Sequence, residues 1–348
     1  KRGLGQSQSD RRIKGFRLRR LVPSGRPHAM PSDKIMRVAF QMDPMEGVNI
    51  AEDTSFALAL EAQRRGAVLF EYGPQHLAYD GGRVIAHARP MVLRDQIGDH
   101  VTFEDRRLID LADDVDVVWM RQDPPFDMSY ITACHLLEML KGRTLVANDP
   151  TWVRSCPEKI VPLDYAHLMP PTMIARNKGM IDAFRAEHGT VIVKPLYGNG
   201  GAGIFKLSPD DSNYSSLLEM FFESSREPVM VQAFIPEVSA GDKRILIVDG
   251  QLAGGFNRVP LKGETRSNMH VGGQAQPAAL TETDIALAEE LGPMLHDRGQ
   301  ILVGIDVIAG RLTEINLTSP TGVHELKRFT GVDTAALCWD AIERRLEG

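Results

Sequence analysis

The stretch Thr190-Val-Ile-Val-Lys-Pro-Leu-Tyr-Gly-Asn-Gly-Gly-Ala-Gly-Ile-Phe205 decides how this chain is interpreted. Its first four residues are β-branched and apolar, which is typical of a buried strand, and Lys194 follows directly. Four glycines then fall within six residues, from Gly198 to Gly203. Because glycine lacks the Cβ atom that would keep backbone N–H groups away from phosphate oxygens, the stretch predicts a phosphate-binding loop.

The glycine spacing also matches the dinucleotide-binding fingerprint, but that motif requires a helix directly after the glycines. Here Ile204–Leu207 alternates apolar and polar residues before Ser208-Pro209, so we expect the loop to be the tip of a hairpin between two strands. The sequence has no P-loop pattern, and in protein kinases the lysine follows the glycine-rich loop, whereas Lys194 precedes this one. A hairpin turn without any ligand is the simpler alternative.

A second motif spans residues 301–322, where polar side chains interrupt two apolar strands. Glu314 and Asn316 are two residues apart, so their side chains project from one face of a strand. Hard oxygen ligands of this kind suit Mg²⁺ held against nucleotide phosphates. Solvent-facing polar positions are the alternative interpretation, which the apolar neighbours disfavour.

Whether Asp306 joins that face depends on the turn between the two strands. A three-residue turn, Ala309–Arg311, would place Asp306 opposite Glu314 on the same face. A two-residue turn would send it to the other face, so the sequence alone leaves the ligand set open.

Composition sets outer limits on function. The chain has 348 residues, 43% of them hydrophobic, and a formal charge of −6, which indicates a soluble globular protein with two or three domains. No apolar stretch approaches the length of a membrane helix, so no membrane partner is expected. Three widely spaced cysteines argue against a disulfide framework or a zinc cluster and favour the cytoplasm.

The N-terminal segment differs from the rest of the chain. Residues 1–34 carry ten Lys or Arg against two Asp, with almost no aromatic residues. We therefore expect residues 1–35 to be a disordered basic extension or an added leader. An acidic body without interleaved aromatic and basic residues argues against a nucleic-acid partner.

From Met36 onward the pattern is α/β. Two apolar stretches are predicted to be strands, Arg37–Met42 and Ala67–Tyr72. Between them we expect a helix, which Asp53 can cap and Gly66 can end. The pattern therefore predicts a parallel βαβ unit. Three regions follow from the pattern: an N-terminal substrate-binding domain over 36–155, a small lobe with the glycine-rich loop over 156–232, and a C-terminal lobe over 233–348. The last region holds an Asp249-Gly250 hairpin signal, the metal hairpin and a long lid loop over 260–276.

Five ordered motifs, which cover the chain from about Met36 to its end, together resemble the prokaryotic-type glutathione synthetases of the ATP-grasp superfamily. Tyr197 and Asn199 depart from the family pattern, and so does the basic extension. The motifs are Arg121-Gln-Asp-Pro-Pro-Phe-Asp127, Lys194-Pro-Leu-Tyr-Gly-Asn-Gly-Gly-Ala-Gly203, Gly241-Asp-Lys-Arg-Ile-Leu-Ile-Val-Asp-Gly250, Gly263-Glu-Thr-Arg-Ser-Asn268 and Thr313-Glu-Ile-Asn-Leu-Thr-Ser-Pro-Thr321.

The resemblance implies an α/β and α+β fold, in which an N-terminal α/β pre-ATP-grasp domain precedes a two-lobed ATP-grasp domain. It also implies that ATP phosphorylates the carboxylate of γ-glutamylcysteine, that glycine attacks the acyl phosphate, and that ADP and phosphate leave. ATP and Mg²⁺ or Mn²⁺ would be the cofactors, and a homotetramer or homodimer the assembly.

The resemblance also assigns residues to roles. Those expected to bind the nucleotide are Lys159, Lys194, Gly198, Asn199, Gly200, Gly201, Ala202, Gly203, Gln232, Phe234, Ile235 and Asp242. The expected metal ligands are Asp306, Glu314 and Asn316. The expected catalytic residues are Arg244, Arg258, Arg266 and Asn268. The expected substrate contacts are Asp43, Arg121, Ser319 and Thr321.

Two rival functions share this pattern. One is another ATP-grasp carboxylate–amine ligase, such as one that adds glutamate to a protein or joins two D-alanines. The other is a nucleotide-binding regulator without turnover, which the complete set of Lys194, Asp306, Glu314 and Asn316 disfavours, since a degenerate site would be expected to have lost a ligand.

Overall fold

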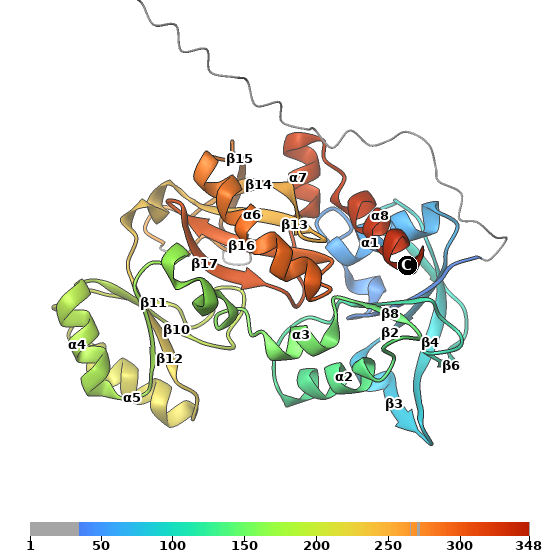
Figure 1. The fold of residues 1–348 in the computed structure, drawn as a ribbon, viewed down its shortest axis with the longest axis horizontal. Coiled ribbons are helices and arrows are strands. Elements are labelled where there is room, and N and C mark those ends of the chain that lie inside the picture. The colour runs from blue at the N-terminus through green and yellow to red at the C-terminus, as the bar shows by residue number, and fades with distance from the viewer. Residues whose placement is uncertain (1–34, 265, 270–271, 348) are drawn as a thin grey trace, which may run out of the picture. The chain divides into compact units, whose positions relative to one another are not determined.

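The first part of the chain forms a mixed sheet with a parallel centre (Figure 1). The computed structural model describes residues 35–264, 266–269 and 272–347. The predicted extension over 1–35 lies outside this range except for Ile35, as do Thr265, His270 and Val271 of the predicted lid. The first strands are β1 Arg37–Gln41, β2 Val68–Tyr72, β3 Leu77–Asp80, β4 Arg83–Leu93, β5 Val101–Phe103, β6 Arg107–Asp110, β7 Val117–Met120 and β8 Leu145–Ala147.

Strand pairing confirms the predicted parallel unit. The order is β3-β4-β2-β1-β7-β8, and β1 pairs in parallel with both β2 and β7. Asp53 caps the intervening helix, since its carboxylate accepts a hydrogen bond from the Phe56 N–H at 2.6 Å. The helices and 3₁₀ turns of this part are η1 Met45–Gly47, α1 Thr54–Arg64, η2 Pro74–His76, α2 Met128–Glu138 and α3 Pro150–Ser155.

A second, antiparallel sheet carries the glycine-rich hairpin. Its order is β11-β10-β12-β9, and one apolar cluster from Ala175 to Val231 fills the space between this sheet and its helices. The elements are η3 Val161–Leu168, which precedes the sheet, β9 Thr172–Ala175, α4 Lys178–His188, β10 Val191–Pro195, β11 Phe205–Leu207, α5 Tyr214–Ser224 and β12 Val229–Ala233.

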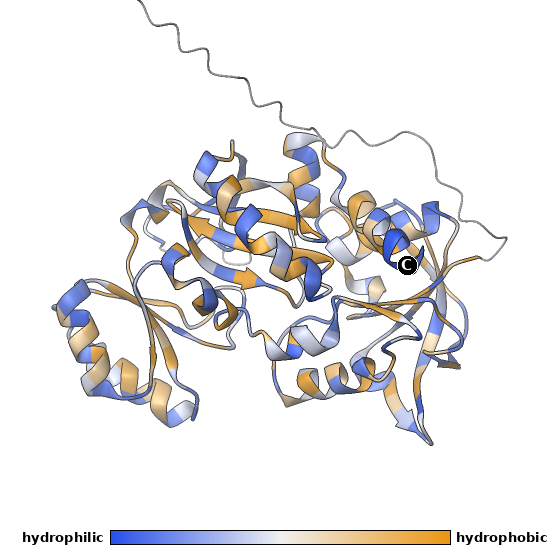
Figure 2. Cartoon of the chain, in the orientation of Figure 1, coloured by the Kyte–Doolittle hydropathy of each residue, from blue (hydrophilic) through white to orange (hydrophobic). Residues whose placement is uncertain are grey.

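The third sheet carries the predicted metal hairpin and is also antiparallel, in the order β15-β14-β13-β16-β17. Its central strands β13 and β16 are mostly hydrophobic in Figure 2, consistent with burial on both faces. The elements are η4 Pro236–Ala240, β13 Asp242–Val248, β14 Gln251–Val259, β15 Gln274–Pro277, α6 Glu282–Asp297, β16 Leu302–Ile308, β17 Arg311–Asn316, α7 Val323–Thr330 and α8 Thr334–Glu347.

The end of the chain returns to the first sheet. Helix α8 packs on α1, where the Trp339 indole N–H donates to the Leu58 carbonyl at 2.7 Å. The rings of Trp119 and Trp339 meet edge to face with centroids 6.2 Å apart. The predicted C-terminal lobe over 233–348 therefore shares a core with the N-terminal domain, because its last helix covers that domain's sheet.

The predicted metal hairpin, formed by β16 and β17, has the two-residue turn and still places Asp306 opposite Glu314. Ile308 pairs with Arg311 across Ala309 and Gly310, which both have positive φ. A β-bulge at Thr313 then shifts the register by one residue, and the Thr313 hydroxyl donates to the Asp306 carbonyl at 3.1 Å. The expectation that a two-residue turn would separate the two carboxylates is therefore wrong, because it assumed an unbroken ladder.

The predicted lid loop over 260–276 is shorter than expected at its C-terminal side. Residues from Gln274 onward form strand β15, where Gln274 pairs with Val259 and Gln276 with Asn257. Hydrogen bonding to the edge of β14 organises this polar segment, which has no hydrophobic period of its own.

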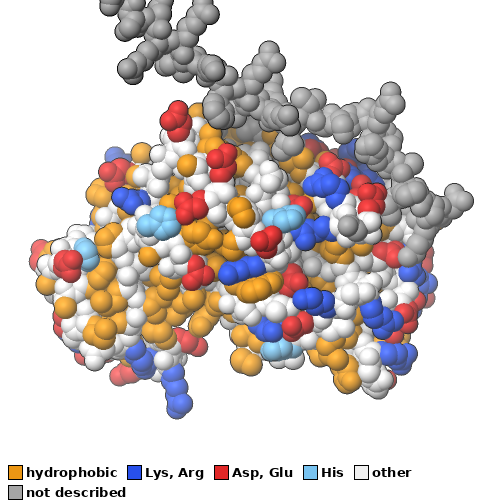
Figure 3. All heavy atoms as spheres, in the orientation of Figure 1, with side chains coloured by type: hydrophobic (Ala, Val, Ile, Leu, Met, Phe, Trp, Pro, Cys, Tyr) orange, Lys and Arg blue, Asp and Glu red, His pale blue; other side chains and the backbone are white. Residues whose placement is uncertain are grey.

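Surface charges are mixed on the visible face. Acidic and basic side chains are interspersed in Figure 3 rather than gathered in a basic field of the kind that nucleic-acid-binding proteins use. Among the described residues, none of the helices is both long and apolar enough to cross a membrane.

Gly250 provides a stability test of the Asp249-Gly250 turn between β13 and β14. Its φ is +77°, and a Cβ there would lie 2.5 Å from the Gly292 carbonyl oxygen. Gly66 has a similar φ of +87° but open space around it. We expect Gly66→Ala to cost about 1–2 kcal/mol of unfolding free energy, and Gly250→Ala about 1–3 kcal/mol more. Urea unfolding measures both, and equal losses would contradict a steric role for Gly250.

Candidate active site

A cavity of about 680 Å³ brings together residues that follow or lie on all three sheets. Most of the predicted site residues line it, and they come from segments far apart in the sequence. They are Arg121, Lys159, Lys194, Gly198, Asn199, Gly200, Gly201, Ala202, Gln232, Phe234, Ile235, Asp242, Arg244, Arg258, Arg266, Asn268, Asp306, Glu314, Asn316, Ser319 and Thr321.

Two predicted residues are not among those lining the cavity. Asp43 is exposed, and its carboxylate accepts a hydrogen bond from the Asp123 N–H at 3.0 Å. Asp43 therefore fixes the loop after β7, and the structure does not bring its side chain to the cavity as a substrate contact. Gly203 lies at the far end of the glycine-rich loop, against the Pro195 ring.

The glycine-rich loop is the tip of an antiparallel hairpin, as expected. Val191 pairs with Leu207 and Val193 with Phe205, and the chain enters a strand after the glycines. This geometry rules out the dinucleotide-binding interpretation, which needs a helix at that point. Gly201 has φ +83°, and a Cβ there would lie 2.9 Å from the Asn268 side-chain oxygen, so glycine permits the close approach of loop and lid.

Two buried lysines converge on Glu314. The Lys194 ammonium lies 3.2 Å from Glu314 Oε1, and the Lys159 ammonium lies 3.6 Å from the same atom and also donates to the Gly198 carbonyl. Burial would raise the pKa of Glu314, but the two lysines outweigh it and hold that pKa below its usual value. The result is a compact array of positive charge beneath the loop.

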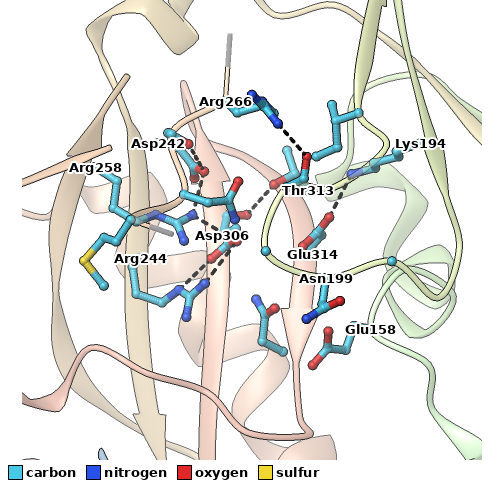
Figure 4. A pocket seen from close by; sticks show the side chains of 18 of the residues that line it. Glu158, Lys194, Asn199, Asp242, Arg244, Arg258, Arg266, Asp306, Thr313 and Glu314 are labelled. Atoms are coloured by element: carbon cyan, nitrogen blue, oxygen red, sulfur yellow. Dashed lines mark hydrogen bonds and ion pairs between the residues drawn. The ribbon is translucent and has the colours of Figure 1, made fainter. Parts of the chain in front are cut away.

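On the strand paired with that of Glu314, two arginines converge on Asp306 (Figure 4). Arg244 approaches with two nitrogens, Nε at 2.7 Å from Oδ1 and Nη2 at 3.3 Å from Oδ2. Arg258 lies 2.9 Å from Asp306 Oδ2 and 2.6 Å from Asp242 Oδ2. The Ser267 hydroxyl also donates to Asp242 at 2.7 Å, so the network extends into the predicted lid.

The two carboxylates of this network have opposite pKa shifts. Burial raises the pKa of Asp242 to about 6, with Asp306 adding repulsion and Arg258 acting against both. Burial would raise the pKa of Asp306 too, but Arg244 and Arg258 lower it to about 2. Asp306 therefore stays ionised at neutral pH.

The loop after β7 is tied to the segment that follows the metal hairpin. The buried Arg121 guanidinium donates to the Ser55 hydroxyl and to the Pro320 carbonyl, each at 3.1 Å. The Ser319 hydroxyl donates to the Gln122 carbonyl at 2.9 Å. Burial lowers the pKa of Arg121. Arg121 and Ser319 thus lie on one wall of the cavity.

Gln232 and Phe234, two of the residues expected to bind the nucleotide, line the cavity, but their polar groups are partly engaged. The Phe234 N–H donates to the Thr190 carbonyl at 3.0 Å, so it is not free for a base. The Gln232 side chain donates to the Thr172 hydroxyl at 3.0 Å. Arg266 pairs with Glu264 at 2.7 Å and donates to the Gly201 carbonyl at 3.4 Å, which joins the lid to the glycine-rich loop.

Glu158 is a cavity residue that sequence reasoning missed. Its Oε1 accepts hydrogen bonds from the Leu317 N–H at 3.2 Å, the Thr318 N–H at 3.3 Å and the Thr318 hydroxyl at 2.8 Å. Its backbone carbonyl also accepts from the Ile315 N–H at 3.1 Å. The only sequence signal for Glu158 was its position immediately before Lys159, because its hydrogen-bond partners lie about 160 residues later in the chain.

We expect Glu158→Ala to lower kcat about 10- to 100-fold, the usual range for residues whose hydrogen bonds hold functional groups in position. Glu158→Gln should keep most of the activity, because its amide oxygen can still accept from the Leu317 and Thr318 donors. Steady-state kinetics of both variants test this. Equal losses in the two would show that the charge of Glu158, rather than its bonding, matters.

The donor set fits a hard divalent cation. Among the described residues, no group of three or more His, Cys, Asp or Glu side chains could hold a metal by itself. Mg²⁺, however, is usually bound by one or two carboxylates together with substrate phosphates and water. Asp306 and Glu314 supply two carboxylates on one face, and Asn316 adds an amide whose nitrogen donates to the Gly304 carbonyl at 3.1 Å.

The fold of this chain is similar to that of solved ATP-grasp proteins. Solved structures with similar folds include the D-cycloserine synthetase DcsG, with a TM-score of 0.63 and 17% identity over 89% of this chain and 99% of that one. A RimK domain ATP-grasp protein from Sphaerobacter thermophilus has a TM-score of 0.59 and 18% identity over 87% of this chain and 98% of that one. The α/β and α+β class is thereby confirmed.

The family follows from closer relatives. Residues 36–154 match the model of the prokaryotic glutathione synthetase N-terminal domain, and residues 158–331 match that of its ATP-grasp domain. The chain is 51% identical over 312 residues to a glutathione synthetase of Agrobacterium fabrum, covering 90% of this chain and 98% of the relative. It is 53% identical over 308 residues to that of Mesorhizobium japonicum, covering 88% and 98%.

This chain belongs to the prokaryotic glutathione synthetase family. It is an ATP-dependent carboxylate–amine ligase of glutathione synthesis, as the resemblance implied.

Proposed function

We propose that this enzyme makes glutathione through an acyl phosphate. ATP would phosphorylate the cysteinyl carboxylate of γ-glutamylcysteine, and the amine of glycine would then attack the acyl carbon and release phosphate. The observation that carries the proposal is the hairpin β16–β17, where Lys159 and Lys194 meet Glu314 and where Arg244 and Arg258 meet Asp306. Two clusters of cations thus face one cavity, as a reaction with phosphoryl and acyl oxyanions requires.

The lysines are proposed to hold the ATP phosphates under the glycine-rich loop. Lys194 is 4% exposed and Lys159 is equally buried, so each ammonium group is poorly hydrated and gains from a phosphate partner. The backbone of Gly198 to Ala202 would cover those phosphates from above.

Asp306, Glu314 and Asn316 are proposed to hold Mg²⁺ or Mn²⁺. When bound, the cation would neutralise charge on the transferring phosphoryl group. The same carboxylates keep the lysine and arginine side chains extended toward the cavity, so the protein's positive charges are in place before the substrates arrive.

The arginines are proposed to act on the acyl group. A guanidinium presents a planar fork that matches carboxylate and oxyanion geometry, and Arg244 already binds Asp306 with two nitrogens. Arg266 and Asn268, in the predicted lid, would exclude water from the acyl phosphate, which hydrolysis would otherwise destroy. Arg121, Ser319 and Thr321, which also line the cavity, would hold γ-glutamylcysteine.

ADP release tests the proposal. We expect turnover with ATP, Mg²⁺, γ-glutamylcysteine and glycine together, and its loss when any one component is omitted. EDTA in excess should abolish turnover, and added Mg²⁺ or Mn²⁺ should restore it. ADP release at the same rate without γ-glutamylcysteine would contradict this acid, and full activity in EDTA would contradict the metal.

The remaining family properties are proposed on resemblance alone. These are a cytoplasmic location and a homotetramer or homodimer. Light scattering on the purified protein would decide the assembly, and a monomeric mass would contradict both forms.

A further inference from the structure

Tyr197, which directly precedes the first glycine of the loop, makes a contact that the reaction scheme does not use. Its ring stacks on Phe126 with centroids 6.1 Å apart and planes inclined by 21°. Tyr197 is 40% exposed, so core packing does not explain its aromatic side chain. The stack joins the glycine-rich hairpin to the loop that follows β7.

Each ring belongs to a segment that carries a proposed functional residue. Tyr197 directly precedes Gly198, whose carbonyl accepts from Lys159. Phe126 belongs to the loop that begins with the buried Arg121, and its ring also contacts Tyr130 at a centroid distance of 5.2 Å. The stack therefore links the proposed phosphate loop to the proposed γ-glutamylcysteine wall.

The Tyr197–Phe126 stack connects the second sheet to the first part of the chain, to which the core of that sheet does not extend. The apolar cluster of that sheet is built from its own strands and helices, so its core does not anchor it to the first sheet. The polar contacts of the glycine-rich hairpin with the rest of the cavity involve Lys159, Lys194 and Arg266. Bound substrates would compete for these cationic groups, whereas an aromatic stack uses none of them.

The Phe126 side of the stack is firmly held. Asp127 caps helix α2 by accepting from the Tyr130 N–H at 3.0 Å, and the Asp123 N–H donates to Asp43 at 3.0 Å. Arg121 is fixed by its two hydrogen bonds at the start of the loop. Movement at Tyr197 would therefore be transmitted to a constrained loop.

We propose that the Tyr197–Phe126 stack couples the two substrate sites, so that the nucleotide and γ-glutamylcysteine each raise the other's affinity. The inference rests on the proposed function, which puts the nucleotide under the glycine-rich loop and the acid beside Arg121. Aromatic pairs of this kind contribute enough energy for about a 2- to 10-fold effect on affinity.

Calorimetry on the full chain tests the coupling. The Kd of γ-glutamylcysteine is measured with and without saturating AMPPNP and Mg²⁺, and the ratio of the two values is the coupling factor. We expect a factor of about 2–10 in the wild type, a value near 1 in Tyr197→Ala and in the Tyr197→Ala/Phe126→Ala pair, and a retained factor in Tyr197→Phe. Tyr79→Ala, a similarly exposed tyrosine on β3, should behave as the wild type.

The outcomes separate this inference from the proposed function. An unchanged factor in Tyr197→Ala, or a wild-type factor of 1 with both ligands bound, would overturn the coupling and leave the function intact. Failure of the wild type to bind AMPPNP or γ-glutamylcysteine would overturn both. Because Phe126→Ala could perturb folding, the decisive variants are those of the exposed Tyr197, checked by their melting temperatures.

Discussion

Replacing Glu314 with Gln is expected to lower kcat on the order of 10²–10³-fold, the range seen when one preorganised electrostatic group is removed. The carboxylate aligns Lys159 and Lys194 and is a proposed metal ligand, and the amide carries no charge for either role. The melting temperature should change little, because the amide oxygen of the glutamine can still accept a hydrogen bond from Lys194, and Lys159 keeps its bond to the Gly198 carbonyl. ADP release and thermal unfolding measure the two effects.

Glu289→Gln is the matched control, since Glu289 is exposed on helix α6 and lies outside the cavity. It should keep wild-type turnover. Near-normal activity of Glu314→Gln would overturn the metal assignment. A large fall in its melting temperature would instead show that Glu314 acts mainly on the fold.

Arg258→Met should cost about 3–5 kcal/mol of unfolding free energy, the usual penalty for removing one partner of a buried ion pair. Arg258 is 3% exposed and lies between Asp242 and Asp306. Its loss would leave Asp242 with the Ser267 hydroxyl and no facing guanidinium. Urea unfolding gives the free energy, and turnover should also fall sharply.

A second substitution sharpens this test. Asp242→Asn in the Arg258→Met background removes the stranded charge, so it should recover part of the lost stability without recovering turnover. Arg143→Met breaks an exposed pair with Asp113 and should cost only about 0–1 kcal/mol. If Arg258→Met were no worse than Arg143→Met, the buried network would contribute little to stability.

Local signals were enough to predict much of the fold. The Asp53 cap and the Gly66 stop bracket α1, and the alternation after the glycines predicts the β10–β11 hairpin. These features depend on neighbouring residues, which a sequence displays directly. The cavity lining was mostly predictable for the same reason, because the oxygen-bearing and cationic residues stand in ordered motifs.

Features that depend on distant partners were not predictable. The register of Asp306 is set by a bulge at Thr313, whose hydroxyl finds a carbonyl on the opposite strand. The role of Glu158 depends on Thr318, and Asp43 faces the Asp123 backbone rather than the cavity. In each case the partner is chosen by the tertiary fold, and no periodicity in the sequence encodes it.

The contact between Trp119 and Trp339 makes the enzyme its own spectroscopic reporter. Both indoles are buried at the seam between β7 and α8, while Trp152 is 36% exposed. Edge-to-face indoles in a rigid site give a strong near-ultraviolet circular dichroism signal. Detachment of the final helix would extinguish that signal even where the sheets stay folded, so undocking of the chain's end can be followed without a label.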